Sequence, residues 1–225
     1  MIKIERKVTE KAQRAIMALQ EARRRNSTYN TPEVYAALQE LFHGKCYICE
    51  NKDSTSYQIE HLYPHGENAD LKYDWNNLFL ACAHCNNTKL AKYDPIINCT
   101  EKNVEELIAF RKKGYFGTEE ELLFEPLDFE KETINTQQLL QDVHYGTTPQ
   151  KKVEAKILRK SLRKELSEFK EYVREYQEAE DAEKEDLACL LKLQLGDSSS
   201  FAAFKRWLIR DHKERFPELF TYINS

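Results

Sequence analysis

Cys46-Tyr47-Ile48-Cys49 and Cys82-Ala83-His84-Cys85 are two cysteine pairs in a chain of 225 residues. In each pair, the gap of two residues lets both thiolates coordinate the same ion with tetrahedral geometry. Residues 50–81 separate the pairs, a longer interval than in a simple zinc ribbon. Because four thiolates leave no open coordination position, we predict that these cysteines bind a structural Zn²⁺.

The composition is that of an ordinary globular protein, with 41% hydrophobic and 32% charged residues and a net charge of −4. The first residues lack the apolar stretch of a secretory signal, and no stretch approaches the roughly 18 apolar residues of a membrane span. We therefore expect a cytoplasmic protein with no membrane partner. In a reducing compartment, paired cysteines bind metal more often than they form disulfides.

Helical patterns flank the cysteine segment on both sides. Before it, Ala12, Ala15, Ile16 and Leu19 share one helical face, and a second helix is expected from the N-cap residue Thr31 to Gly44. After it, the spacing predicts helices over residues 103–113, 150–179, 186–195 and 201–212, with an acidic linker without clear period over residues 117–133.

The cysteine segment itself has a different character. Two short strand-like runs, 57–61 and 78–81, are separated by a polar loop, and a short helix is expected after Cys85. The whole chain is thus predicted to have an α+β, mostly helical fold. A small zinc-stapled ββα module over residues 45–95 lies between an N-terminal helical arm, residues 1–44, and a helical C-terminal region, residues 96–225.

Three further motifs lie in and after the segment between the cysteine pairs. They are Ile59-Glu60-His61-Leu62-Tyr63-Pro64-His65, Trp75-Asn76-Asn77-Leu78, and Asn86-Asn87-Thr88-Lys89 directly after the second pair. Their order and spacing resemble the HNH, or ββα-metal, nucleases, and three coincident elements are far more specific than one. The resemblance implies an endonuclease that hydrolyses phosphodiester bonds, most naturally in DNA, with nucleic acid as its partner.

Carried over by position, the resemblance assigns a role to each motif residue. It implies that His61 is the general base, that Asn77 braces the loop between the strands, and that Glu60 and Asn86 bind a catalytic Mg²⁺ or Mn²⁺. Glu60 stands where many members have Asp. The chemistry fits these residue types, since histidine titrates near neutral pH and hard divalent ions prefer oxygen ligands.

Three other polar residues of the module have two interpretations each. His65 is expected to contact the substrate phosphate, or to be an exposed loop histidine. Lys89, one helical turn beyond Asn86, either contacts that phosphate or is solvated. For His84, inside the second cysteine pair, a surface position without a functional role is the favoured interpretation.

The wider layout also resembles the HNH subunit of Septu and related retron-linked antiphage systems, in which the nuclease works with an ABC-type ATPase subunit. This resemblance extends from Cys46 to Lys92 and into the stretch Ser200–Trp207. It implies a defence role with that ATPase as partner. The chain itself has no Gly-rich phosphate loop. The alternative is a non-catalytic zinc module that binds nucleic acid or protein, which leaves the Glu60-His61 pair unexplained.

Local charge limits where a phosphate backbone can bind. Residues 41–95 hold five Lys against seven Asp and Glu, so the module is mildly acidic. Residues 1–30 hold eight Lys and Arg against three Glu, including Arg23–Arg25, and residues 151–164 hold seven against one. We expect phosphate binding to depend on one of these stretches, on the cations between Lys205 and Arg210, or on a partner.

Overall fold

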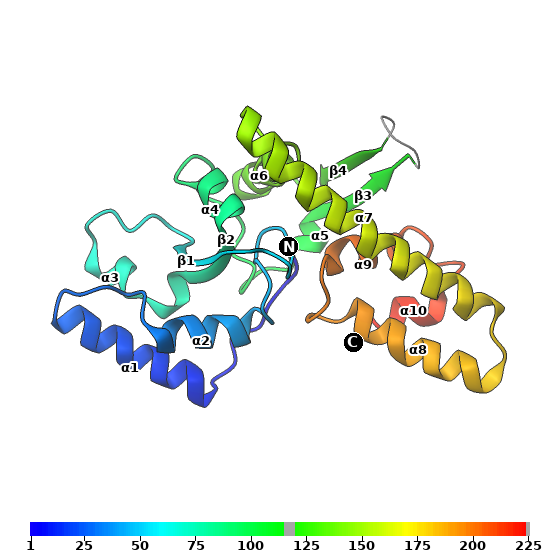
Figure 1. Cartoon of the computed structure of the whole chain (residues 1–225), viewed down its shortest axis with the longest axis horizontal. Coiled ribbons are helices and arrows are strands. Elements are labelled where there is room, and N and C mark those ends of the chain that lie inside the picture. Colours follow the sequence, from blue (N-terminus) through cyan, green and yellow to red (C-terminus); the bar gives the residue numbers. More distant parts are fainter. Residues whose placement is uncertain (115–119, 224–225) are drawn as a thin grey trace.

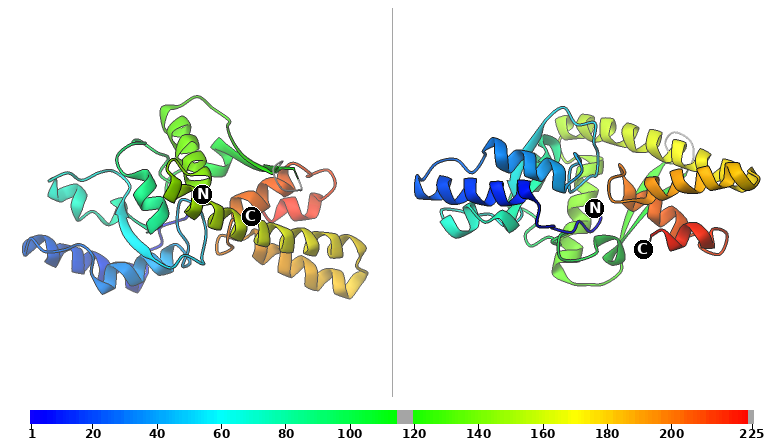
Figure 2. Two further views of the ribbon diagram at one scale, coloured as in Figure 1. Left: turned by 45° about the horizontal axis from the view of Figure 1, so that its top comes forward. Right: turned by 90° about the horizontal axis from the view of Figure 1, so that it is seen from below.

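The computed structural model describes residues 1–114 and 120–223, and its helices surround two small antiparallel sheets (Figure 1). The predicted α+β, mostly helical fold is confirmed. The molecule is elongated. The N-terminal helices lie at one end, and the turn at residues 179–180 lies at the other (Figures 1 and 2). Within the described residues, no helix combines the length and apolar character needed to cross a membrane.

Two antiparallel helices form the N-terminal part, α1 (Glu10–Arg24) and α2 (Pro32–Leu41). Each begins at a threonine, Thr9 or Thr31, whose hydroxyl accepts a backbone N–H of the first turn, as expected of an N-cap. The predicted apolar face of α1 is wrong at one position. Ile16 is 38% exposed, because the buried stripe runs along small residues and Leu19.

The middle of the chain forms the predicted ββα unit. Strand β1 (Tyr57–His61) pairs antiparallel with β2 (Leu78–Cys82), with Ile59 opposite Leu80. The connection holds α3 (Ala69–Lys72) and the short 3₁₀ helix η1 (Trp75–Asn77). Helix α4 (Ala83–Lys89) starts directly after β2 and so contains Cys85 rather than following it, because the Cys82 sulfur caps the backbone N–H of Cys85.

The prediction of a helix over residues 103–113 is wrong. Only α5 (Val104–Leu107) is helical, and β3 (Ile108–Lys113) follows it and pairs with β4 (Glu121–Pro126) inside the expected acidic linker. The apolar residues at the start of β3 are all buried, which a strand on the core allows and a single helical face does not. Residues 115–119 of that linker lie outside the described residues.

Five helices complete the fold. They are α6 (Lys131–Tyr145), α7 (Pro149–Glu178), α8 (Asp181–Leu195), α9 (Ala202–Arg210) and α10 (Pro217–Thr221). The long helix predicted over residues 150–179 is confirmed by α7, whereas α6 and α10 were not expected. Val153 and Ile157 of α7 are apolar but exposed, because the buried face of the helix turns toward α6 and α9.

The buried side chains form two hydrophobic clusters. The larger one unites α1, α2, both sheets, α6, the first half of α7 and α9, so the small ββα unit is buried against all its neighbours. The smaller one lies between the second half of α7, α8, α9 and α10. The ββα unit therefore belongs to the main core, which explains how so few residues hold their positions.

Candidate functional site

The four cysteines of the two pairs come together from three elements. Cys46 and Cys49 lie in the loop after α2, Cys82 ends β2, and Cys85 lies in the first turn of α4. All four are buried, and their sulfur atoms lie within 4.8 Å of one another. The sulfurs of Cys49 and Cys82 are 3.9 Å apart. A tetrahedral Zn²⁺ with Zn–S bonds of about 2.3 Å places its sulfurs about 3.8 Å apart, so the residues fit a structural zinc ion.

His61 ends β1 with its ring held by a backbone carbonyl. Nε2 lies 3.0 Å from the carbonyl oxygen of Lys72. A carbonyl oxygen only accepts hydrogen bonds, so the neutral ring carries its proton on Nε2 and leaves the lone pair on Nδ1. Burial lowers the pKa of His61 below its ordinary value, although the Lys72 carbonyl acts in the opposite direction. The ring is therefore neutral near pH 7 and has the form of a general base.

Two aromatic rings surround His61. The centroid of the Tyr29 ring lies 4.5 Å from it, edge to face, and the His65 ring is also 4.5 Å away. The Nδ1 atom of His65 is buried without a hydrogen-bond partner among the described residues. His65, expected to contact phosphate or to be an exposed loop histidine, is thus half-buried as a wall of the His61 site.

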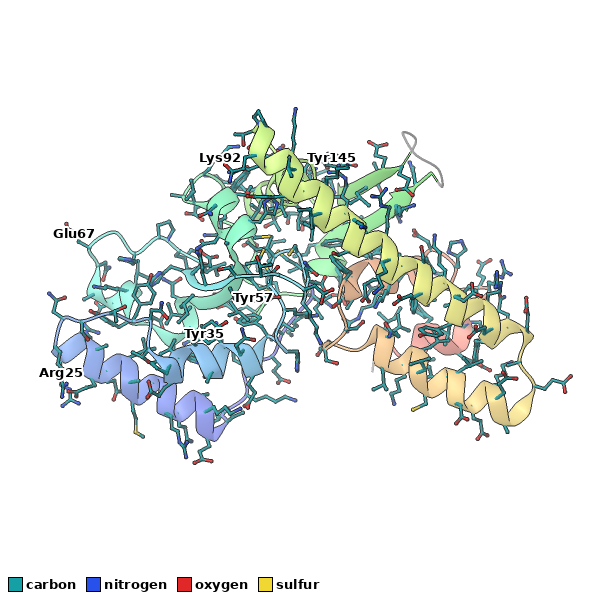
Figure 3. The ribbon with its side chains drawn as sticks, viewed as in Figure 1. Arg25, Tyr35, Tyr57, Glu67, Lys92 and Tyr145 are labelled. Carbon is teal, nitrogen blue, oxygen red and sulfur yellow. The ribbon has the colours of Figure 1, made fainter. Side chains whose placement is uncertain are left out.

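A polar hollow lies beside β1 on the other side of Tyr29. Its volume is about 390 Å³, and it is lined by Tyr29, Asn30, Tyr35, Tyr57, Gln58, Ile59 and Asn86. In Figure 3 the labelled Tyr35 and Tyr57 mark the two elements that border it, α2 and β1. Tyr29 lines the hollow and also contacts the His61 ring, whereas His61 itself does not line the hollow.

Asn77 lies buried at the end of the connection between the strands. Its amide nitrogen donates to the carbonyl oxygens of Tyr63 and Leu71, and its amide oxygen accepts the N–H of Tyr63. Leu62 N–H also donates to the Asn77 carbonyl. These bonds tie the loop to η1 and so position Lys72, whose carbonyl orients His61.

Replacing Asn77 is expected to loosen this loop. In Asn77→Ala the loop groups lose their partner, and leaving buried polar groups unpaired costs about 1–3 kcal/mol. We expect a lower free energy of unfolding, measured by denaturant titration. Asn76→Ala is the matched control, since Asn76 is exposed and its side chain makes no hydrogen bond within the described part of the chain. Equal stability of the two variants would contradict the bracing role.

Glu60 points into the interior rather than toward solvent. Its carboxylate accepts a hydrogen bond from the Tyr47 hydroxyl at Oε1, and the Lys89 ammonium lies 3.5 Å from Oε2. Burial raises the pKa of Glu60 to about 7, while Lys89 and Tyr47 favour the ionised form. The carboxylate is therefore enclosed by protein partners on both oxygens.

Lys89 has a different position from either of those expected. It is 1% exposed, and its ammonium donates to the carbonyls of His61 at 3.1 Å and Leu62 at 2.9 Å. Neither contact with a phosphate nor solvation describes this geometry, because a buried ammonium needs protein acceptors. Lys89 instead joins the end of α4 to the end of β1 and holds the backbone of His61.

Asn86, at intermediate exposure on α4, faces Gln58. Its amide nitrogen donates to the Gln58 side chain at 2.7 Å, and no contact joins it to Glu60 within residues 1–114 and 120–223. A divalent ion at Glu60 would also have to displace the Tyr47 hydroxyl or lie beside the Lys89 ammonium. In this arrangement Glu60 and Asn86 thus do not form the expected pair of ligands for Mg²⁺ or Mn²⁺. Among the described residues, the cysteines are the one group of His, Cys, Asp and Glu side chains close enough to share an ion.

The favoured interpretation of His84 as a surface residue is wrong. Its side chain is 12% exposed, with Nδ1 2.7 Å from the Glu154 carboxylate and Nε2 2.8 Å from the Val143 carbonyl. Val143 lies on α6 and Glu154 on α7, so the ring attaches both helices to the second cysteine pair. The reason is tertiary, since the burial of His84 comes from helices more than fifty residues further along the chain.

These elements form a site in which a four-cysteine cluster, a strand and a helix fix one histidine. Residues 46–92 match the HNH endonuclease family. The match begins at Cys46, the first of the four clustered cysteines, ends just beyond α4, and contains every predicted site residue. No curated protein matches the chain. We call residues 46–92 the HNH module.

Two neighbours of the HNH site were not anticipated. Tyr29 lies outside the HNH module, in the connection between α1 and α2, and only the packing of those helices brings it to His61. Tyr47 lies between Cys46 and Cys49, and its hydroxyl donates a hydrogen bond to the Glu60 carboxylate. The one signal in the sequence was a large aromatic side chain between two cysteines that are expected to be buried, which favours a buried position for Tyr47 as well.

Proposed function

We propose that this protein is an endonuclease that hydrolyses phosphodiester bonds in DNA with His61 as general base. The observation that carries the proposal is the bond between His61 Nε2 and the Lys72 carbonyl, which leaves a lone pair on Nδ1. The HNH family match at residues 46–92 supports the same chemistry. Asn77 and Lys89 support it indirectly, because both hold the backbone on which His61 and Lys72 depend.

The reaction follows from the form of the histidine. Nδ1 of His61 accepts a proton from a water molecule, and the water oxygen attacks the phosphorus of a phosphodiester bound beside the ring. A phosphorus–oxygen bond then breaks, and the leaving oxygen gains a proton from solvent. The zinc ion takes no part in the chemistry and, when bound, only holds β2 and α4 in place.

Cleavage is expected to follow the protonation of His61. The base must be neutral, and the buried position lowers its pKa below the ordinary value of 6.5. The rate is therefore retained above that lowered pKa and lost as the pH falls through it. A profile of cleavage rate against pH should show its acidic inflection below about 6.5. An inflection above that value would contradict a desolvated base.

The competing function is a zinc module that binds without cleaving. The two are separated by incubating the zinc-loaded chain with supercoiled DNA and with RNA, each with added Mg²⁺ or Mn²⁺. We expect nicked or linear DNA from the wild type and intact DNA from His61→Ala. Absence of strand breakage with either ion would favour the binding module, and preferential breakage of RNA would correct the substrate.

We further propose a cytoplasmic role in antiphage defence with an ABC-type ATPase subunit. The support is the sequence resemblance to the HNH subunit of Septu and related systems, together with the absence of a phosphate-binding loop from the sequence. On this proposal, nucleotide dependence comes from the partner. DNA cleavage by the chain, with and without an added ABC-type ATPase subunit, tests the pairing, and unchanged cleavage would speak against it.

A further inference from the structure

The structure pairs the cations of two clusters within the basic stretches, Lys205 to Arg210 and Arg23 to Arg25. Lys205 is buried and its ammonium lies 2.8 Å from the Glu165 carboxylate, while Arg206 and Arg210 pair with the buried Glu105. Near the other end of the molecule, the cations from Arg23 to Arg25 pair with Asp70 and Glu21. Lys205 and Arg206 are thus committed to carboxylates of the protein, and the exposed pairs of Arg23 to Arg25 lower the net positive charge at that end.

The first half of α7 is different. Lys152, Lys156 and Lys160 are exposed and lie at intervals of four residues, so they form one stripe along the helix. In the part of the chain that the structure describes, none of the three has an ion pair. The acidic residue among them, Glu154, pairs with His84, so the lysines share the exposed face with the apolar Val153 and Ile157 and with no unpaired carboxylate among the described residues of this segment.

The four-residue spacing of these lysines destabilises helix α7 itself. Like charges at intervals of four residues are neighbours on a helix surface and destabilise it. Four residues rise about 6 Å along the axis, so the ammonium groups repeat at regular intervals on one line. This arrangement is stabilised by a partner that carries a row of negative charges, as a nucleic-acid backbone does.

The stripe begins next to the HNH module. Lys151, adjacent to Lys152, donates to the carbonyl of Asn87 at 2.9 Å, and Asn87 follows Asn86 on α4. Glu154 holds the same first turns of α7 against His84. Figure 1 shows the start of α7 beside α4, from where the helix runs away along the molecule.

We infer that Lys152, Lys156 and Lys160 on α7 form a track for the phosphate backbone of the nucleic acid that the HNH module cleaves. The inference rests on the proposed function and places the substrate outside the mildly acidic module. The module supplies the base, and α7 supplies the positive charge that the module lacks. Each lysine contacts phosphates, so the track adds affinity without sequence preference.

The test is the triple variant Lys152→Gln, Lys156→Gln, Lys160→Gln, made in the full chain with His61→Ala so that the probe survives. Binding to a fluorescent 30-base-pair DNA duplex is measured over a series of salt concentrations without added divalent ion. Each phosphate contact contributes about 0.9 to the slope of log K against log salt. We expect the slope to shrink by about 2 to 3 and the affinity to fall on the order of 100-fold near 0.15 M salt.

The matched control is Lys184→Gln, Lys192→Gln, Lys213→Gln. It removes the same charge from two positions on α8 and one in the turn after α9. It should retain the wild-type affinity and slope. The stripe variant should also keep its melting temperature, since the substitutions relieve repulsion. Unchanged affinity and slope in the stripe variant would overturn the track and assign the stripe to another anionic partner, such as a protein.

Failure of the inference can be told apart from failure of the proposed function, because binding and cleavage are read separately. If the His61-containing wild type cleaves DNA while the stripe variant binds normally, the nuclease stands and the track is refuted. If the wild type never cleaves but the stripe variant loses binding, the track stands and the catalytic proposal is refuted.

Discussion

Substituting Cys82 by serine is expected to release the zinc ion and unfold the HNH module. A structural Zn²⁺ contributes an apparent 10–16 kcal/mol to small zinc modules near pH 7, about as much as the whole stability of an ordinary domain. Cys82 ends β2 and caps α4, so its loss removes both a metal ligand and the start of the helix. We expect about one zinc per wild-type chain by elemental analysis, none in Cys82→Ser, and a large fall in melting temperature.

The chain offers a control for this experiment. Cys189 on α8 is exposed and lies apart from the four-cysteine cluster. Cys189→Ser should retain zinc and melt like the wild type. Zinc content in Cys82→Ser equal to that of the wild type would show that the four cysteines do not share an ion, and the structural role of the metal would fail with it.

The His61→Ala variant is expected to keep its fold and zinc while its cleavage rate falls by about 10²- to 10⁴-fold. That range is the usual contribution of a positioned general base. His61 is only half-buried at the end of β1, and its ring makes one hydrogen bond, to a backbone carbonyl. The fold therefore depends on it far less than the reaction does. Single-turnover cleavage of supercoiled DNA measures the rate, and thermal melting checks the fold.

Alanine variants of two other histidines serve as comparisons for His61→Ala. His212→Ala, an exposed position after α9, should cleave like the wild type. His65→Ala removes a ring that packs against His61 without holding it by a hydrogen bond, so its effect should be smaller than that of His61→Ala. A full loss in His65→Ala with normal cleavage in His61→Ala would reassign the base to His65.

The HNH module was predictable because its features are local in sequence. The cysteine spacing and the Glu60-His61 pair on a five-residue strand follow from patterns within a few residues, and the helix expected after Cys85 differs only in starting at Ala83. The cysteine cluster could be predicted from the single assumption that the two pairs share one ion. The hairpin of β3 and β4 was missed because its apolar residues read equally well as a short helix, and only pairing across the turn selects the strand.

The roles of polar residues in the site were harder to predict, because they depend on which groups end up buried. Glu60 and Asn86 looked like a pair of metal ligands in the sequence, yet Tyr47 and Lys89 enclose Glu60, and Gln58 holds Asn86. Lys89 looked like a surface cation and is an interior one. In each case the free energy of burial is set by neighbours that the linear spacing does not reveal.

By itself, the sequence determined the zinc cluster, the ββα order and the candidate base, because chemistry at short range depends on residue type and spacing. Only the tertiary structure decided which cations are free to meet a substrate. It buried Lys205 and Arg206 against carboxylates and left the lysine stripe of α7 open beside α4. The physical reason is that a charge is available only where folding has not already given it a partner, and those partners come from distant parts of the chain.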